Sequence, residues 1–560
     1  MTVAGGARAA ALGAAWLWIA AAALSAQAYD VLIRAGRLLD GSGNPWRASD
    51  LAIDGDRIVA MGDLADATGR LEIPAGGLYV APGFIDVHSH AAPGLASSEL
   101  SGAVPLLAQG VTVVVVNPDG GGPIDLARQR EQLLAEGLGV NVALLVPHAA
   151  VREAVLGMED RAPDRAELER MRALVGAGME AGAFGLSSGL FYAPGSYART
   201  AELVELARVA AASGGVYTSH IRDEADYTVG VVAAVDEVIR IAEEAGLPGI
   251  VTHVKVLGPR VWGFSGALVL RVEQARARGV EVYADQYPYD ASGTSIAGAL
   301  IPRWVQVGGR EALLRRLADP AERARVRAEV IESLDRRGGA ERLVFGRYPP
   351  DPAIEGRSLA SVAQERRVHA ADLALDLLDG GDASLVSFNM TERDIATFMR
   401  QPWTMTSSDG DLSTLGTGHP HPRWYGTFPR KIRKYVLEDG VIGLEDAVRS
   451  MTSLAAGVFG LADRGTLRVG ALADVVVFDL ERLRDVASYE DPHRLSEGVV
   501  WVLVNGEVAV AEGKATGVMA GQVLRRARGD GGQLRAAGAH LEVGEQEGSL
   551  AGGGLPQPER

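Results

Sequence analysis

Hydrophobic and polar residues follow two different patterns along this chain. Between about residues 81 and 454, short apolar runs are separated by segments whose apolar residues recur at helical spacing. The apolar runs are GFIDVH, VTVVVVN, NVALLVP, AFGLSSG, GVYTSH, GIVTHV, VEVYADQ and WTMTSSD. Clear helical patterns cover residues 97–110, 123–137 and 164–182, and each of them ends at Gly. Eight strands with helices between them predict a (β/α)8 TIM-like barrel of the α/β class.

The predicted barrel segment is longer than a barrel needs, because a (β/α)8 core takes only ~250 residues. We therefore expect an insertion after the seventh strand, over about residues 291–400. This stretch is rich in charged and helix-forming residues. It also contains LVSFNM, an apolar run that is a ninth strand candidate in addition to the eight barrel strands.

The two ends of the chain share the other pattern, in which short strand-like runs are separated by turn dipeptides. Residues 29–80 and 455–529 both read this way, and the sequence NGE at 505–507 predicts a tight hairpin. Two β-rich segments at opposite ends predict one small β-sandwich module that is built from both termini. The Gly-rich polar stretch at residues 530–560 is expected to be a disordered tail.

Composition adds three constraints to this picture. The chain has 560 residues, 47% of them hydrophobic, which is enough to bury a sizeable core. A net charge of −16 argues against a nucleic-acid partner, because phosphate binding needs a basic face. Cysteine is absent, so any metal ion must be held by His, Asp, Glu or modified Lys.

Residues 1–28 have the pattern of a signal peptide. Arg8 precedes a long apolar run, and AQA at 26–28 matches a cleavage site. The run is short for a membrane span and no stop-transfer pattern follows it. We expect cleavage before Tyr29, export to the periplasm or medium, and no stable membrane anchor afterwards. An uncleaved anchor or a disordered alanine-rich start is the alternative.

Residues suited to metal chemistry stand at the ends of the predicted strands. The carboxyl ends of barrel strands form the active-site face of this fold. In strand order, the residues found there are His88 and His90, Asn117 and Asp119, His148, His220, His253 and Asp409. Because the chain has only ten histidines, such a concentration at strand ends is not what a random distribution would give.

The spacing of these residues predicts a metal site. His88 and His90 are two residues apart, so on a strand both side chains point to the same face. His220 and His253 come from strands across the barrel and can complete a cluster with them. Imidazole and carboxylate suit Zn2+ and similar ions, and a bound ion lowers the pKa of water toward neutrality. Asp409 could then accept a proton as a general base.

Each of these residues also has a structural interpretation when it is taken alone. A single His at a strand end is more often a hydrogen-bonded polar residue than a ligand, and Asp409 beside Gly could be a turn residue. Four histidines and one aspartate in barrel order favour the metal site.

The motifs that surround these residues resemble the amidohydrolase superfamily, and within it the N-acyl-D-amino-acid deacylases, or D-aminoacylases. The resemblance extends from about Tyr29 to about Gly513. It is carried by PGFIDVHSH, VPHAAVREAVLG, EAGAFGLSSGLFYAPGSYA, YTSHIRDE, HVKVLG, DQYPYDASGT, TSSDG, HPHPRWYGTFPR and GTLRVGALADVVVFD.

The resemblance implies a set of roles for this site. His220 and His253 would bind the tighter of one or two Zn2+ or other divalent ions, and His88 and His90 the weaker. Asp409 would be the catalytic acid and base. The residues expected to receive the free carboxylate of a small-molecule substrate are Lys255 and Arg423, with Tyr289 and Arg222 as further candidates. For Lys255 and Arg423, a structural ion pair is the alternative.

The sequence departs from the family at the group that bridges two ions. D-aminoacylases commonly carry a Cys after the second strand, where this chain reads VVVVNPDGGG. Other amidohydrolases use a Lys or Glu from the fourth strand, which here reads AFGLSSG. Asp119 is the candidate substitute, because a carboxylate can bridge two ions. The equally open alternative is that NPDGG is a turn and that the site holds one ion.

The leading functional hypothesis is a metal-dependent hydrolase that cleaves the amide bond of N-acyl-D-amino acids. A D-peptidase, a dipeptidase or a cyclic amidase on the same barrel is the alternative within the fold. A non-catalytic periplasmic binding protein is a hypothesis of another class. The complete set of four histidines and Asp409 argues against it.

Overall fold

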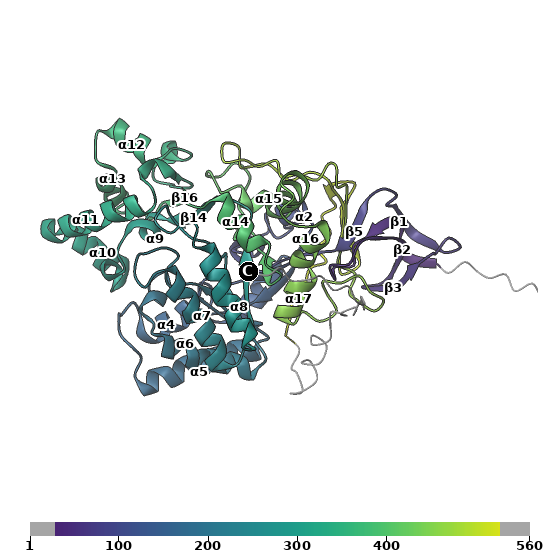
Figure 1. Ribbon diagram of the computed structural model, residues 1–560, viewed down its shortest axis with the longest axis horizontal. Coiled ribbons are helices and arrows are strands. Elements are labelled where there is room, and N and C mark those ends of the chain that lie inside the picture. Colours follow the sequence, from purple (N-terminus) through teal and green to yellow (C-terminus); the bar gives the residue numbers. More distant parts are fainter. Residues whose placement is uncertain (1–27, 527–560) are drawn as a thin grey trace, which may run out of the picture.

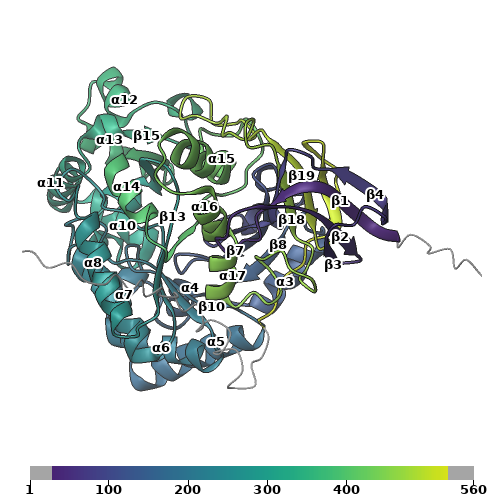
Figure 2. The same cartoon turned by 45° about the vertical axis from the view of Figure 1, so that its right-hand side comes forward.

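A computed structural model of the protein describes residues 28–526 (Figures 1 and 2). The predicted signal peptide, except for its last residue, and the predicted tail at 530–560 lie outside the described residues. Within residues 28–526, no helix is both long enough and apolar enough to cross a membrane.

The eight predicted barrel strands are all present and run parallel. They are β6 (Phe84–Asp86), β7 (Val111–Val116), β8 (Asn141–Leu144) continued by β9 (Val146–Pro147), β10 (Gly185–Gly189), β11 (Val216–His220), β12 (Gly249–Val251), β13 (Val282–Gln286) and β17 (Thr404–Thr406). Neighbours pair in this order, as two sheets of three and six strands. Beyond β6 and β17, Asp409 N donates to His88 O (2.9 Å) and His90 N donates to Gly410 O (2.7 Å). These bonds close the ring, so the prediction of a (β/α)8 barrel is confirmed.

The barrel strands form where apolar residues are continuous, because both faces of a parallel sheet are covered. Every residue of β7, VTVVVV, is buried. The covering helices lie around the outside (Figure 2); they are α3 (Leu126–Ala135), α4 (His148–Leu156), α5 (Arg165–Glu180), α6 (Thr200–Ala212), α7 (Val231–Ala245) and α8 (Ser265–Ala277). In α5, Asp164 and Glu167 form a capping box, which explains why the helix begins there.

The helix expected at residues 97–110 is much shorter than predicted. Only α2 (Val104–Leu107) is helical, and α1 (Ala92–Leu95) precedes it. Ala103 adopts a left-handed backbone with φ of 52°, which stops a helix from continuing through it. Pro105 has no N–H to donate, so it is tolerated only at the start of a helix.

Strands from both ends of the chain form one nine-stranded sheet. The N-terminal strands are β1 (Ala28–Leu38), β2 (Arg47–Asp54), β3 (Arg57–Gly62), β4 (Thr68–Pro74) and β5 (Tyr79–Pro82). The C-terminal strands are β18 (Val475–Phe478), β19 (Val499–Val504), β20 (Glu507–Ala511) and β21 (Lys514–Ala515). Antiparallel pairing of β5 with β18 joins the two groups. Asn505 (φ 50°) and Gly506 (φ 86°) make the predicted hairpin turn between β19 and β20.

The insertion after β13 folds around a hydrophobic core of its own. Its sheet has the order β14-β16-β15, with β14 (Ala291–Ser295), β15 (Leu343–Phe345) and β16 (Ser384–Phe388). The run LVSFNM therefore belongs to the insertion and not to the barrel. Its helices are α9 (Ile296–Leu300), α10 (Gly309–Ala318), α11 (Pro320–Arg336), α12 (Leu359–Arg366) and α13 (Ala370–Leu377). Figure 1 shows the insertion and the nine-stranded sheet on opposite sides of the barrel.

The chain returns to the barrel through α14 (Glu392–Met399) and, after β17, packs further helices against it. These are α15 (Arg423–Arg430), the π-helical η5 (Lys431–Glu438), α16 (Leu444–Met451) and α17 (Ser453–Phe459). Short 3-10 turns cover Gly195–Tyr197, Arg303–Gln306, Ala340–Arg342 and Pro352–Ile354.

Lys431, the first residue of η5, is buried, and its side-chain partners are hydroxyl groups of β17 and α16. Its Nζ donates to Thr406 Oγ1 and Ser450 Oγ, both at 2.8 Å. Among the described residues, no carboxylate lies within 4.0 Å of Nζ. Burial without a counter-ion disfavours the charged form and lowers the pKa of Lys431 to about 7.

We expect Lys431→Met to stabilise the protein at neutral pH. Between pH 7 and 10.5 the unfolded chain binds a proton at Lys431 that the folded chain does not, so wild-type stability falls as the pH falls through this window. One pKa unit is worth about 1.36 kcal/mol, and we expect a gain of about 2–4 kcal/mol at pH 7. Urea unfolding of the wild type and of Lys431→Met at pH 7 and pH 9.5 measures the difference in their free energies of unfolding. An equal effect at both pH values would contradict this explanation.

Candidate metal centre and active site

The predicted metal ligands converge at the carboxyl ends of the barrel strands. His88 and His90 follow β6, Asp119 follows β7, His220 ends β11, and His253 and Asp409 follow β12 and β17. Two groups of potential ligand atoms result, in each of which all atoms lie within 4.8 Å of one another. One group contains His88, His90, Asp119 and Asp409, and the other contains Asp119, His220 and His253.

Asp119 is the residue that the two groups share. Its Oδ1 lies 3.5 Å from His88 Nε2 and 3.6 Å from His253 Nε2. Its Oδ2 lies 3.5 Å from His90 Nε2 and 3.8 Å from His220 Nδ1. Each carboxylate oxygen therefore lies near one histidine of the β6 pair and one histidine from across the barrel, so the carboxylate of Asp119 is within reach of both pairs.

Three of the site residues have backbones in the left-handed region. The φ angles are 55° at Asp119, 35° at His253 and 48° at Asp409. This region is unfavourable for residues other than glycine, and the surrounding structure must hold such residues in place. Residues held in this way cluster at functional sites.

Two buried carboxylates hold these strand ends in position. Asp86 accepts hydrogen bonds from Ser408 N (2.8 Å) and Ser408 Oγ (2.5 Å), which ties the end of β6 to the segment that carries Asp409. Burial raises the pKa of Asp86 to about 6. Asp285 accepts from His253 N (2.8 Å) and Ser407 Oγ (2.6 Å), which fixes the segment that follows β12.

Two carboxylates act on His90 at the centre of the site. Burial opposes the charged form of His90, but Asp119 and Asp409 raise the pKa of His90 to about 10. The same carboxylates would attract a metal cation.

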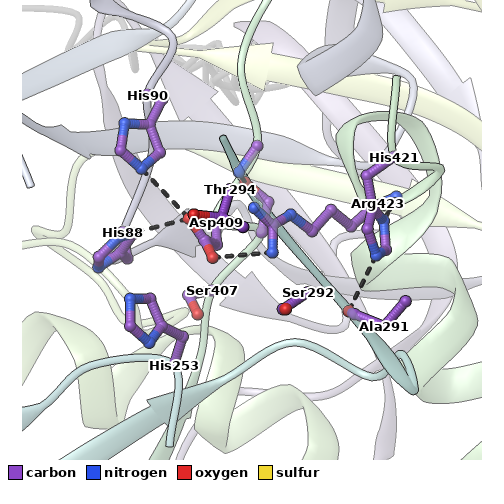
Figure 3. Close-up of polar contacts among 12 residues, drawn as sticks. His88, His90, His253, Ala291, Ser292, Thr294, Ser407, Asp409, His421 and Arg423 are labelled. Atoms are coloured by element: carbon purple, nitrogen blue, oxygen red, sulfur yellow. Dashed lines mark hydrogen bonds and ion pairs between the residues drawn. The ribbon is translucent and has the colours of Figure 1, made fainter. Parts of the chain in front are cut away.

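Asp409 is held between the histidines and an arginine (Figure 3). Its Oδ1 lies 3.2 Å from His90 Nε2 and 3.5 Å from His88 Nε2, and its Oδ2 lies 2.8 Å from Nη1 of Arg423. Burial alone would raise the pKa of Asp409, but Arg423 and the histidines hold it well below its usual range. Asp409 is therefore a carboxylate, with one oxygen facing the metal ligands.

The donor atoms fit a metal ion. His88 Nε2, Asp119 Oδ1, His220 Nδ1 and His220 Nε2 are buried and have no hydrogen-bond partner among the described residues. Buried polar atoms are normally paired, because leaving one unpaired costs free energy. Imidazole nitrogens and carboxylate oxygens around one point form a donor set that suits zinc and similar ions.

A cavity of about 720 Å³ opens over these ligands. Barrel residues His90, Asp119, His220, His253 and Asp409 line its floor, and Ser292, Gly293 and Thr294 of β14 line a wall. The insertion thus contributes directly to the site. A volume of this size is typical of sites that take small molecules.

Comparison with known proteins decides the family. The model of the amidohydrolase family matches residues 72–510. The chain belongs to the amidohydrolase family.

Individual relatives of this amidohydrolase agree with the match. The chain is 37% identical over 519 residues to N-acyl-D-glutamate deacylase of Alcaligenes xylosoxydans xylosoxydans, covering 89% of this chain and 96% of the relative. The crystal structure of N-acyl-D-glutamate deacylase from Bordetella bronchiseptica, with zinc and a phosphonate mimic of the tetrahedral intermediate, is 35% identical. It superimposes with a TM-score of 0.76 and covers 89% of this chain and 100% of its own.

A D-aminoacylase with a binuclear metal centre is 32% identical to this amidohydrolase. It has a TM-score of 0.76, and the match covers 89% of this chain and 100% of the D-aminoacylase. For that enzyme, activation by one metal and attenuation by the second are described. The predicted resemblance to D-aminoacylases and the prediction of an amidohydrolase enzyme are confirmed.

The amidohydrolase site contains a carboxylate that the sequence reasoning missed. Glu224 is buried and lies 3.5 Å from His220 Nε2 and 3.3 Å from His253 Nδ1, on the side of each ring away from Asp119. It also accepts a hydrogen bond from Lys255 Nζ at 2.5 Å. Partners on the second ring nitrogen of a metal-binding histidine orient the ring. The sequence signal that could have identified Glu224 was its position in YTSHIRDE, four residues after His220.

Lys255 and Arg423 both line the cavity, as predicted, and both contact a carboxylate. Lys255 Nζ donates to Glu224 and to His253 O (3.0 Å), and Arg423 is paired with Asp409. Arg423 Nε has no hydrogen-bond partner among the described residues, whereas Nη1 is the atom that contacts Asp409. The guanidinium of Arg423 lies 4.6 Å from the ring centroid of Tyr287, a residue that the sequence reasoning did not select.

The structure does not bring Arg222 and Tyr289 into the cavity. Arg222 makes a bidentate ion pair with Glu237 at 2.8 Å and donates to the carbonyls of Ser196 and Ala198. The hydroxyl of Tyr289 donates to Pro422 O at 3.4 Å. Both donor groups are engaged by protein partners and neither residue lines the cavity, so a role of Arg222 and Tyr289 in substrate binding stays a prediction.

His148 is also a structural residue. Its Nε2 lies 2.9 Å from Glu202, which also binds Arg152. It belongs to neither group of potential metal ligands.

Proposed function

We propose that this protein hydrolyses the amide bond of N-acyl-D-amino acids to a carboxylate and a free D-amino acid. The observation that carries the proposal is the position of Asp409, between the histidines of a candidate metal site and a buried arginine. The activities named for relatives with 35–37% identity over nearly the whole chain support it.

We propose Zn2+ as the metal, as one or two ions. His88 and His90 would hold one ion, His220 and His253 the other, and Asp119 would contact both. When bound, a divalent ion lowers the pKa of water and polarises an amide carbonyl. The zinc in the related deacylase and the binuclear centre of a D-aminoacylase support this proposal.

Asp409 is placed to move the proton in this reaction. Hydrolysis forms a bond between the water oxygen and the acyl carbon and breaks the carbon–nitrogen bond. Asp409 Oδ1, which faces the metal ligands, accepts the proton of the attacking water and then delivers it to the nitrogen that leaves as an amine. Arg423 keeps Asp409 ionised, and therefore able to accept that proton.

Arg423 is also placed to orient the substrate. In an N-acyl amino acid, only the α-carbon separates the scissile nitrogen from the α-carboxylate. A carboxylate bound by Arg423 therefore lies next to the nitrogen that Asp409 protonates. Arg423 Nε is a donor without a protein partner, and a guanidinium can bind a carboxylate through two hydrogen bonds.

An activity panel tests the proposal. We expect the Zn2+-loaded protein to release acetate from N-acetyl-D-amino acids and not from their L enantiomers, because with the carboxylate and the amide in place the two enantiomers exchange the positions of the side chain and the α-hydrogen. Activity should disappear with a chelator and return with Zn2+. D-dipeptides and hydantoins are included for the alternative activities. Turnover of either class without turnover of any N-acetyl-D-amino acid would refute the proposal.

A further inference from the structure

Arg337 is a buried arginine that lines the cavity from the insertion. It follows α11 directly, and only 1% of its surface is exposed. Its Nε donates to Ala299 O and its Nη1 donates to Ser387 Oγ, both at 3.2 Å. No carboxylate of the described residues lies within 4.0 Å of its guanidinium nitrogens. A buried charge without a counter-ion is costly, so a guanidinium on a cavity wall is suited to an anionic ligand.

The other lysine and arginine of the cavity differ from Arg337 in this respect. Lys255 is paired with Glu224 at 2.5 Å, and Arg423 is paired with Asp409 at 2.8 Å. Both ion pairs belong to the centre described above. Of these three cationic side chains, Arg337 is therefore the one without a carboxylate partner among the described residues.

A hydrogen-bond chain beside Arg337 presents a second donor to the cavity. Asn389 Nδ2 donates to Ser387 Oγ and to Ser292 Oγ, both at 2.9 Å. Because Ser292 Oγ accepts this bond, its own proton is available to a ligand, and Ser292 lines the cavity. A guanidinium and a hydroxyl on the same side of a cavity form a suitable site for a carboxylate.

The position of Arg337 separates it from the reacting amide. It belongs to the insertion, and it makes no ion pair or hydrogen bond with Asp409, Asp119 or the four histidines. The α-carboxylate must lie close to Asp409, where Arg423 is available. A carboxylate that reaches Arg337 therefore belongs to a more distant part of the substrate.

We propose that Arg337 selects substrates that carry a second carboxylate, either on the D-amino-acid side chain or at the far end of the acyl group. This proposal rests on the proposed function, since it assigns the substrate class of the same site. Arg337 would bind the substrate and would take no part in the proton transfers.

Substitution of Arg337 tests the proposal on three substrates. N-acetyl-D-glutamate carries the second carboxylate on the side chain, N-succinyl-D-leucine carries it on the acyl group, and N-acetyl-D-leucine lacks it. We expect the wild type to prefer one of the two dicarboxylates. Arg337→Met should lower kcat/KM for that substrate about 10- to 100-fold, mainly through KM, and for N-acetyl-D-leucine less than about 3-fold. Arg337→Lys, which keeps the charge, should lose less.

Arg342→Met is the matched control. Arg342 also lies in the insertion, donates to Phe388 O at 3.2 Å and stacks on Trp262, but it does not line the cavity. It should leave the preference unchanged. An equal loss on all three substrates in Arg337→Met, or a wild type that prefers N-acetyl-D-leucine, would overturn the role of Arg337 and leave the deacylase proposal standing.

Thermal stabilisation by the same compounds separates the two proposals. If the wild type turned over none of them, the deacylase proposal would fail. The Arg337 proposal would then depend on whether a dicarboxylate stabilises the wild type more than N-acetyl-D-leucine does. Loss of that difference in Arg337→Met would support it, and no difference in the wild type would overturn it.

Discussion

Asp409→Asn should lower kcat by about 10³- to 10⁴-fold on N-acetyl-D-amino acids with Zn2+ present, the upper part of the range for general acid–base catalysis. An amide cannot accept the proton of the attacking water or return it to the leaving amine. Asn has nearly the same shape, and it tolerates the left-handed backbone that Asp409 adopts at φ of 48°. The loss should therefore reflect chemistry and leave folding intact.

Steady-state kinetics and metal analysis together check this prediction. KM should change little, because Arg423 remains in place to bind the α-carboxylate. Asp411→Asn is the matched control, because Asp411 lies two residues away, accepts from Leu412 N at 2.7 Å and belongs to neither ligand group. It should keep nearly full activity. Equal activity in Asp409→Asn and the wild type would remove Asp409 from the mechanism.

The barrel could be predicted from the sequence because its strands are buried on both faces. A strand such as VTVVVV then appears as a continuous apolar run, and eight such runs in series leave few other folds. The helix predicted at residues 97–110 was wrong for a local reason. Apolar spacing does not show that Ala103 takes a left-handed backbone immediately before Pro105.

The site could be predicted only where strand geometry determines side-chain direction. His88 and His90 follow the last residue of β6, but strand-like pairing with the segment of Asp409 and Gly410 continues through them, so alternation places both in the barrel mouth. Tyr287 and Tyr289 follow the last residue of β13, Gln286, so alternation no longer applies. Tyr287 stacks on Arg423, whereas Tyr289 stacks on Arg430. Arg337 lies far along the insertion, where no local pattern connects it to the cavity.

Substitutions of Asp119 test whether a carboxylate has taken the place of the cysteine that D-aminoacylases commonly carry after the second strand. The two oxygens of Asp119 face histidines from both ligand groups, so removal of its carboxylate should weaken the binding of both ions. We expect Asp119→Ala to lower zinc affinity by more than about 100-fold, because even outer-shell changes cost 10- to 100-fold. Activity should fall with it. Metal content after dialysis at a fixed free Zn2+ concentration measures the change.

Asp119→Asn and Asp119→Cys separate the bridging role from the alternative role as a turn residue. Asp119 has φ of 55°, a backbone conformation that Asn tolerates well, so Asn preserves the turn and removes the negative charge. A thiolate has no advantage in a left-handed turn, but it binds zinc. If Asp119 is a bridge, Asn should lose zinc and activity while Cys retains part of both. The opposite order, with Asn active and Cys inactive, would show that NPDGG is a turn and that the histidines bind their metal without Asp119.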